Sequence, residues 1–142
     1  MKRDPLEALL RLRRMAVDTA RHDLADCLHA ESEAQARVAA ITASIEHEAA
    51  VAADLTTGDA EVEAFAAWLR RIRPMQRAAE AVLQEAAAET AQARAVLAMA
   101  RAAVRAAEEL QSHHADALRA EAERDAQREL DEAARRGHVP QP

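Results

Sequence analysis

Histidine, cysteine and acidic side chains are the groups in this sequence that could bind a metal or take part in catalysis. Asp18, His22 and Asp26 recur every fourth residue, so a helix would place them on one face. A zinc site needs a further ligand, and none follows at a suitable spacing. A solvated charged face is therefore favoured over a metal site. His113 and His114 are adjacent, and a helix would point them about 100° apart.

Nucleophiles are equally sparse. Cys27 is the only cysteine, which excludes an internal disulfide, and it falls on an apolar stripe where a small buried side chain is favoured over a reactive thiol. No hydroxyl residue has a suitably spaced histidine and acid, and Gly58 and Gly137 are too far apart to form a phosphate-binding loop. We expect no enzymatic activity, no cofactor, no metal and no small-molecule substrate.

The aromatic residues suggest a different kind of chemistry, namely binding to another protein. A short strip contains both of them with two further apolar residues: Phe65, Trp68, Ile72 and Met75. Four arginines flank this strip: Arg70, Arg71, Arg73 and Arg77. Tryptophan beside arginine is a common composition of interaction hot spots. The alternative is that the strip packs on the end of the preceding helix, at Val51 and Leu55.

The composition predicts long helices to position these residues. Alanine makes up roughly 28% of the 142 residues, far above its usual share, and glutamate, arginine and leucine are also abundant. Aromatic and β-branched residues are too few to build a sheet. The net charge is −6 with acidic and basic residues interleaved, which argues against nucleic-acid binding. Neither a signal peptide nor a membrane-spanning stretch is recognisable, so we expect a cytoplasmic protein.

The first helix is expected over about residues 5–55. Asp4 can cap its start, Pro5 suits the first helical position, and Glu7 stands where a capping box has its acid. Apolar residues then recur over about seven heptads, as is typical of a coiled coil. One register holds Leu10, Val17, Leu24, Val38, Ile45 and Ala52, and the other holds Leu6, Ala20, Cys27, Ala34, Ile41 and Leu55. Polar residues interrupt the two registers at Arg13, Glu31 and Glu48.

A turn is predicted at residues 56–59. Gly58 can take the left-handed conformation that ends a helix, and Asp59 can cap the next one. So short a connection requires the two helices to run antiparallel. The second helix is expected over about residues 59–136, followed by a disordered tail at 137–142. Pro74 removes a backbone donor from this helix, so a kink or a short break is expected there.

The two expected helices differ in length, and this difference is informative. In an antiparallel hairpin that turns at Gly58, Leu6 should lie near Glu109. Residues from about 112 to 136 would then have no partner within the chain, and a helix of that length is marginal alone in water. The sequence therefore predicts an all-α fold, a long antiparallel two-helix coiled-coil hairpin in a single domain (1–142), whose second helix extends beyond the first.

The whole chain resembles the FliJ family, small helical-hairpin proteins of the flagellar type III export apparatus. The resemblance rests on the start (Leu6, Leu9, Leu10, Arg11, Leu12 and Arg13), on the aromatic segment from Val62 to Ile72, and on the ending (Arg124, Asp125, Gln127, Arg128, Leu130, Asp131, Glu132, Ala133, Ala134 and Arg136). Two features depart from the family pattern: aromatic residues are fewer, and Pro74 interrupts a helix that is normally continuous.

The resemblance implies a stalk-like role, similar to that of the central coiled coil of rotary ATPases. The terminal segments would engage the hexameric export ATPase, with Leu118, Ala122, Arg128, Leu130 and Arg135 as the candidate contacts. The aromatic strip would face the membrane export gate. Family membership also implies an association with export chaperones and a peripheral position at the inner membrane.

Two alternatives to a flagellar role stay open. One is the corresponding stalk protein of a virulence-type secretion system, which has the same architecture. The other is a general coiled-coil scaffold or homodimer that covers the unpaired segment with a second copy.

Overall fold

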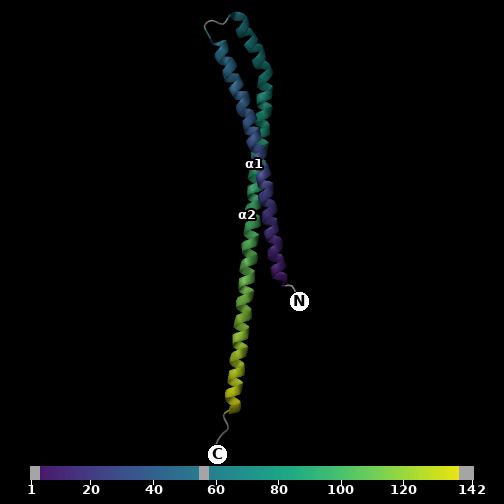
Figure 1. Ribbon diagram of the computed structural model, residues 1–142, viewed down its shortest axis with the longest axis vertical. Helices are drawn as coiled ribbons and strands as arrows, with labels where there is room; N and C mark the ends of the chain where they lie inside the picture. The colour runs from purple at the N-terminus through teal and green to yellow at the C-terminus, as the bar shows by residue number, and fades with distance from the viewer. Residues whose placement is uncertain (1–3, 55–57, 138–142) are drawn as a thin grey trace, which may run out of the picture. The chain divides into compact units, whose positions relative to one another are not determined.

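Two long helices make up most of the residues that the computed structural model describes, which are 4–54 and 58–137. Helix α1 spans Pro5–Ala52 and helix α2 spans Asp59–Gly137 (Figure 1). No strand occurs within these ranges, and the predicted all-α fold is confirmed. The chain divides into two compact units. We call Val17–Met99 the hairpin unit, and Met1–Ala16 together with Ala100–Pro142 the terminal unit.

The start of α1 follows the sequence signals closely. The backbone N–H of Leu6 donates to the Asp4 carboxylate at 2.9 Å, and the N–H of Ala8 donates to the Asp4 carbonyl at 3.2 Å. Asp4 is therefore the N-cap and Pro5 the first helical residue, where the missing proline N–H costs nothing. The Glu7 carboxylate lies 3.9 Å from Arg11, one turn further along the helix.

The turn between the helices differs from the prediction. Helix α1 ends at Ala52, and residues 55–57 lie outside the described residues. Gly58 has no positive φ, so it does not supply the expected left-handed helix end. Its carbonyl instead accepts the N–H groups of Glu61 at 3.2 Å and Val62 at 3.4 Å. Gly58 is thus the N-cap of α2, and Asp59 is its first helical residue rather than its cap.

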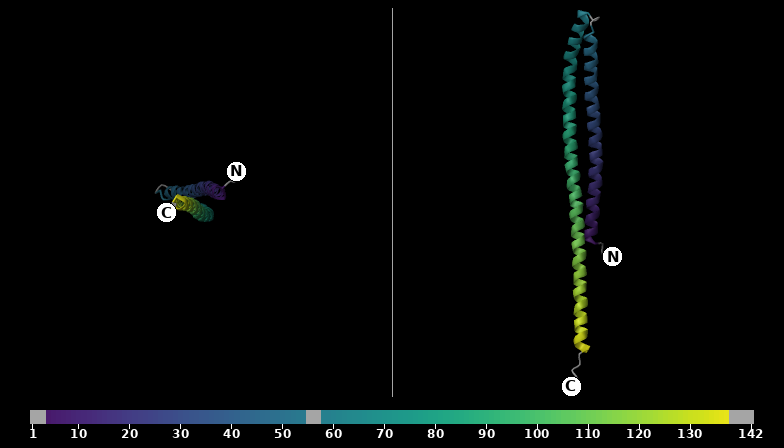
Figure 2. Two further views of the ribbon diagram at one scale, coloured as in Figure 1. Left: turned by 90° about the horizontal axis from the view of Figure 1, so that it is seen from below. Right: turned by 90° about the vertical axis from the view of Figure 1, so that its left-hand side faces the viewer.

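Within the hairpin unit, α1 and α2 run antiparallel, side by side in both Figure 1 and Figure 2. The end of α1 shares a groove with the beginning of α2, through Ala52 and Phe65, whereas Ala34 shares a groove with the later residue Val82. Small side chains dominate the buried positions, which are Val17, Ala20, Ala34, Ala79, Ala86, Thr90 and Leu97. Alanine at the contact lets the two backbones approach closely, but each alanine buries little apolar area.

Pro74 lies inside α2, and the helix continues through it. The expected break is therefore wrong, and the expected kink is not confirmed. Proline leaves the carbonyl of residue Arg70, four positions earlier, without its usual N–H partner. Both residues are exposed, so water can reach this carbonyl, and the helix can continue at a moderate cost.

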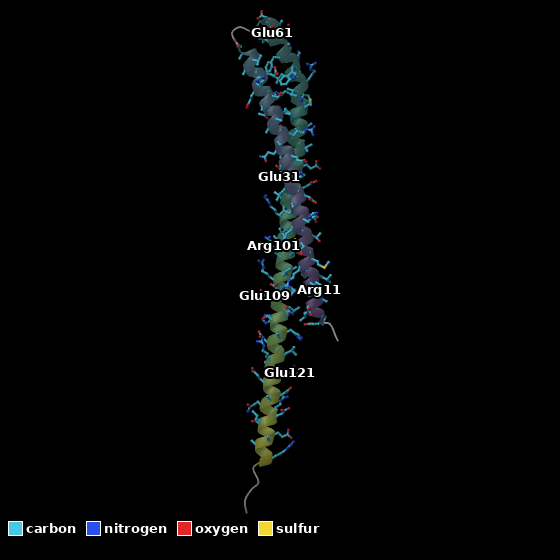
Figure 3. All side chains as sticks on the ribbon, in the orientation of Figure 1. Arg11, Glu31, Glu61, Arg101, Glu109 and Glu121 are labelled. Carbon is cyan, nitrogen blue, oxygen red and sulfur yellow. The ribbon has the colours of Figure 1, made fainter. Side chains whose placement is uncertain are left out.

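Within the terminal unit, the first turns of α1 pack against the middle of α2. Leu10 and Ala107 are buried, and Arg14 forms an ion pair with Glu108 at 3.2 Å. Leu9 and Leu110 line the same groove. Figure 3 labels Arg11 and Glu109 where the two helices lie together. Leu9 lies about one turn after Leu6 and shares this groove with Leu110, the residue after Glu109, so the proximity of Leu6 to Glu109 stays a prediction.

The remainder of α2 in the terminal unit is exposed. Ala115 is half-buried, and every residue from Asp116 to Gly137 is exposed. Figure 3 labels Glu121 on this part of α2. We call residues 116–137 the exposed C-terminal segment. The sequence predicts that the unpaired region begins at about residue 112, and Ala115 is the last half-buried residue of α2. Gly137 is still helical, and the rest of the predicted tail, 138–142, lies outside the described residues.

Candidate protein-binding surfaces

A groove of about 420 Å³ lies between the helices near the turn of the hairpin unit. The rings of Phe65 and Trp68 stack there, with centroids 6.0 Å apart and planes inclined by 28°. Its other lining residues are Glu48, Val51, Ala52, Glu61, Ala64 and Arg71. Both aromatic residues are half-buried and face Val51 on α1, so part of their surface serves hairpin packing. The part that stays open is available to a partner.

Ile72 and Met75 do not extend this groove. Ile72 is half-buried, and the Met75 side chain, 58% exposed, lines a second groove of about 280 Å³. The second groove also contains Ala34, Arg37, Ile41, Ala78, Ala79 and Val82. The predicted strip is therefore two surfaces: a stacked aromatic pair near the turn, and a methionine at the edge of an alanine-lined groove. Leu55, the other proposed packing partner, lies outside the described residues.

The exposed C-terminal segment carries an apolar stripe. Leu118 and Leu130 are 53% and 65% exposed, and Ala122 is exposed between them. Spacings of three and four residues join these positions to three further alanines, giving the series Ala115, Leu118, Ala122, Ala126, Leu130 and Ala133. The same spacing leads back through Gln111 to the buried Ala107. The stripe thus continues the face of α2 that packs against α1 within the terminal unit.

The two candidate arginines of this segment lie off the stripe. At 3.6 residues per turn, Arg128 and Arg135 fall on a different face from Leu118 and Ala122. Arg128 forms an ion pair with Asp125 at 3.2 Å, and Arg119 forms one with Asp116 at 3.1 Å. Arg136 and Glu132 also form an ion pair. Interleaved pairs of this kind make the polar face nearly neutral and favour the helical conformation.

The groups considered for metal binding and catalysis lie on the surface. His22 and Asp26 form an exposed pair at 3.8 Å, and Asp18 pairs with Arg21 at 3.6 Å. Cys27 is a free, half-buried thiol. Across residues 4–54 and 58–137, no three histidine, cysteine or acidic side chains come together as a metal site would require. In the same ranges, neither helix has a stretch apolar enough to cross a lipid bilayer.

Two features of the hairpin unit escaped sequence reasoning. Thr90 is 1% exposed, and its hydroxyl has no hydrogen-bond partner in the described part of the chain. Thr90 lies four residues after Ala86 and seven before Leu97, both of which are buried. This helical spacing could have predicted that Thr90 is buried as well. The stacking of Phe65 on Trp68 was also missed, although side chains three residues apart on a helix are neighbours.

Comparison with protein families gives one decisive result. The family model of the flagellar FliJ protein matches residues 1–141, which is nearly the whole chain. The chain belongs to the FliJ family. No curated protein and no solved structure gives a significant match.

Membership of this family confirms the resemblance drawn from the sequence. FliJ proteins are components of flagellar type III protein export, and the two long helices found here fit a coiled-coil component of that apparatus. Family membership indicates that the partners of the chain are components of the flagellar export apparatus. The family is a structural component of export and is not known for enzymatic activity.

Proposed function

We propose that this FliJ-family chain acts as a stalk in flagellar export, engaging the hexameric export ATPase through the exposed C-terminal segment and the export gate through the hairpin unit. One observation supports the first contact above all others. The stripe that α1 covers in the terminal unit continues uncovered through Leu118, Ala122 and Leu130. An apolar helix face gains free energy when another helix covers it, which is the usual basis of helix-in-groove recognition.

Deleting the exposed C-terminal segment tests this contact. A chain that ends after Ala115 should keep its folded hairpin, because the buried residues found in 4–54 and 58–137 all precede that point. It should lose its ability to stimulate the ATPase. The measurements are ATPase rate against added chain, and circular dichroism to verify folding. Undiminished stimulation by the shortened chain would refute the proposed contact.

A matched pair of substitutions separates the stripe from general charge effects. Leu118→Glu with Ala122→Glu places two carboxylates on the stripe and should weaken binding to the ATPase at least about thirtyfold, as loss of a hot spot does. Ala117→Glu with Ala120→Glu adds the same charge on the opposite face and should leave binding within about threefold of the unsubstituted chain. Equal losses from both pairs would show that the stripe is not the contact.

The gate contact is assigned to the hairpin unit, at Phe65, Trp68, Ile72 and Met75. Trp68→Ala should spare stimulation of the ATPase and weaken binding to the gate by about 2 kcal/mol, roughly thirtyfold. Since Trp68 also packs in the groove, Met75→Glu is the better test of the surface alone, because the Met75 side chain is largely exposed. If both variants bind a purified gate domain as tightly as the unsubstituted chain, the gate contact lies elsewhere.

Self-association is the main competing use of the exposed stripe. A homodimer would bury the stripe against a second copy, and its sedimentation coefficient and helicity would rise with concentration. A stalk component should instead sediment as a monomer until the ATPase is added. A role in a virulence-type system predicts that the chain stimulates a secretion ATPase better than a flagellar one. Escort of export chaperones and peripheral association with the membrane remain predictions of the family resemblance.

A further inference from the structure

Several arginines of the described residues form no ion pair, and three of them lie close together around Pro74. Six arginines elsewhere in the described residues form ion pairs: Arg11, Arg14, Arg21, Arg119, Arg128 and Arg136. In the same ranges, no ion pair is formed by Arg70, Arg73 or Arg77, and all three are exposed. The Arg73 guanidinium donates one hydrogen bond, to the Gln76 side chain at 2.9 Å. The sequence explains the lack of pairs, because α2 has no acidic residue from position 64 to position 79.

These three arginines share one face of α2. Their spacings of three and four residues bring them into one row along the helix. Residues two positions apart on a helix are rotated by about 200°, so Arg70 points away from Trp68, and Arg73 and Arg77 point away from Met75. Arg71 lies apart from the row, since it lines the aromatic groove with Glu48 and Glu61. The arginine row is therefore a surface distinct from the proposed gate contact.

The surface is hollowed as well as charged. A depression of about 430 Å³ is lined by Ala66, Leu69, Arg70, Arg73 and Arg77. Its floor is apolar and its wall carries three guanidinium groups, each a planar fork that fits a carboxylate through two parallel hydrogen bonds. A flat lipid surface would meet the charges but leave the apolar floor uncovered. A peptide with carboxylates and an apolar side chain fits both parts.

We propose that Ala66, Leu69, Arg70, Arg73 and Arg77 form a docking site for an acidic peptide segment of a partner protein. Carboxylates of the segment pair with the three guanidinium groups, and one apolar side chain of the segment packs on Leu69. Helical arginines one turn apart lie about 5 Å apart along the axis, which matches carboxylates one turn apart on a helical partner. The site goes beyond the ATPase and gate contacts proposed above and depends on neither.

The test measures binding of a fluorescent twelve-residue peptide, three repeats of Glu-Glu-Leu-Glu, by anisotropy at low ionic strength. A matched peptide has glutamine in place of every glutamate. The variants of the full-length chain are Arg70→Glu with Arg73→Glu and Arg77→Glu, and the same three positions changed to lysine. The control variant carries Arg94→Glu, Arg101→Glu and Arg105→Glu, which makes the same total change of charge. These three exposed arginines of α2 also form no ion pair within residues 58–137, but they do not line the depression. Circular dichroism verifies that each variant is folded.

The acidic peptide should bind the unsubstituted chain, the glutamine peptide should not, and binding should weaken as salt is added. The triple glutamate variant should lose at least about tenfold in affinity, and the lysine variant about two- to fivefold, because lysine keeps the charge but not the fork. The control variant should bind within about twofold of the unsubstituted chain. Equal losses in the control and the triple glutamate variant would overturn the proposal. So would capture of the chain by phosphatidylglycerol vesicles without any binding of the acidic peptide.

Discussion

The hairpin unit and the exposed C-terminal segment both carry a stripe of alanine and leucine, but the two stripes have different surroundings. In the hairpin unit, α2 presents Ala79, Ala86 and Leu97 to α1, and all three are buried. In the exposed C-terminal segment, Leu118, Ala122 and Leu130 repeat this pattern, and all three are exposed. The local sequence is alike, and what differs is whether a second helix lies opposite. An alanine–leucine stripe therefore specifies a helix-binding face, and its exposure marks where a partner from outside the chain is expected.

The sharpest way to break this comparison is to place a charge on each stripe. Ala86→Asp buries a carboxylate without a partner and should destabilise the chain by about 3 kcal/mol or more. Ala122→Asp makes the same change on the exposed stripe and should alter the free energy of unfolding by less than about 0.5 kcal/mol. Urea unfolding followed by circular dichroism measures both. Similar losses at the two positions would mean that the exposed stripe is covered in solution.

Pro74 provides the next largest expected effect. The helix continues through Pro74 with a missing hydrogen bond at Arg70, so Pro74→Ala restores that bond and should stabilise the chain by up to about 3 kcal/mol. Thermal unfolding measures the gain. As a control, Ala120→Pro in the exposed C-terminal segment should reduce helicity without lowering the midpoint of the main transition. A loss of stability in Pro74→Ala would show that the hairpin packing requires the proline.

The buried hydroxyl of Thr90 gives a smaller effect, confined to the covered stripe. Thr90→Val removes a polar group that has no partner in the described structure while keeping its shape, and should stabilise the chain by about 1 kcal/mol. Thr42→Val, at a half-buried position on α1, is the matched control and should change stability by a few tenths of a kcal/mol, to judge from surface substitutions. Destabilisation by Thr90→Val would indicate that water or a rearranged backbone group satisfies the hydroxyl in solution.

The smallest expected effect on stability concerns the part of α2 where its contact with α1 ends. Glu108→Ala removes the ion pair with Arg14, which is largely exposed to solvent, and should cost no more than about 1 kcal/mol. Glu121→Ala, on the exposed C-terminal segment, should cost nothing measurable. The difference between the two should vanish in 1 M salt, where the Debye length is about 3 Å. A salt-independent difference would assign the effect to packing rather than charge.

The sequence alone was sufficient for the features that depend on local chemistry. Asp4 and Pro5 predicted the start of α1 because capping depends on a few adjacent residues. Heptad spacing likewise predicted two helices and an unpaired end. Details that depend on the geometry between helices were missed. Which residues of α1 and α2 share a groove depends on the path of the connection, which a short turn sequence does not determine.

The candidate site was predicted less well than the fold. The strip from Phe65 to Met75 divides between two grooves, because each side chain's surroundings depend on which residues of α1 lie opposite. A related reason applies to the backbone changes that were expected at Gly58 and Pro74. Glycine and proline signal a change of backbone conformation, but Gly58 caps α2 with an ordinary φ, and solvent exposure allows α2 to accommodate Pro74.

The stripe from Ala107 to Ala133, which Gln111 interrupts once, has a consequence for the way a partner can bind. A helix that docks at Leu130 and extends along the stripe meets, at Ala115, the face that α1 occupies within the terminal unit. Beyond that point the incoming helix and α1 compete for the same positions, and each turn that one gains the other loses. Such an exchange displaces Leu6 and Leu9, which are half-buried, and then Leu10, which is buried and costs the most to expose. The point on α2 where pairing with α1 gives way to pairing with the partner helix can thus move along α2. The exchange stops where Leu10 would have to leave its buried position.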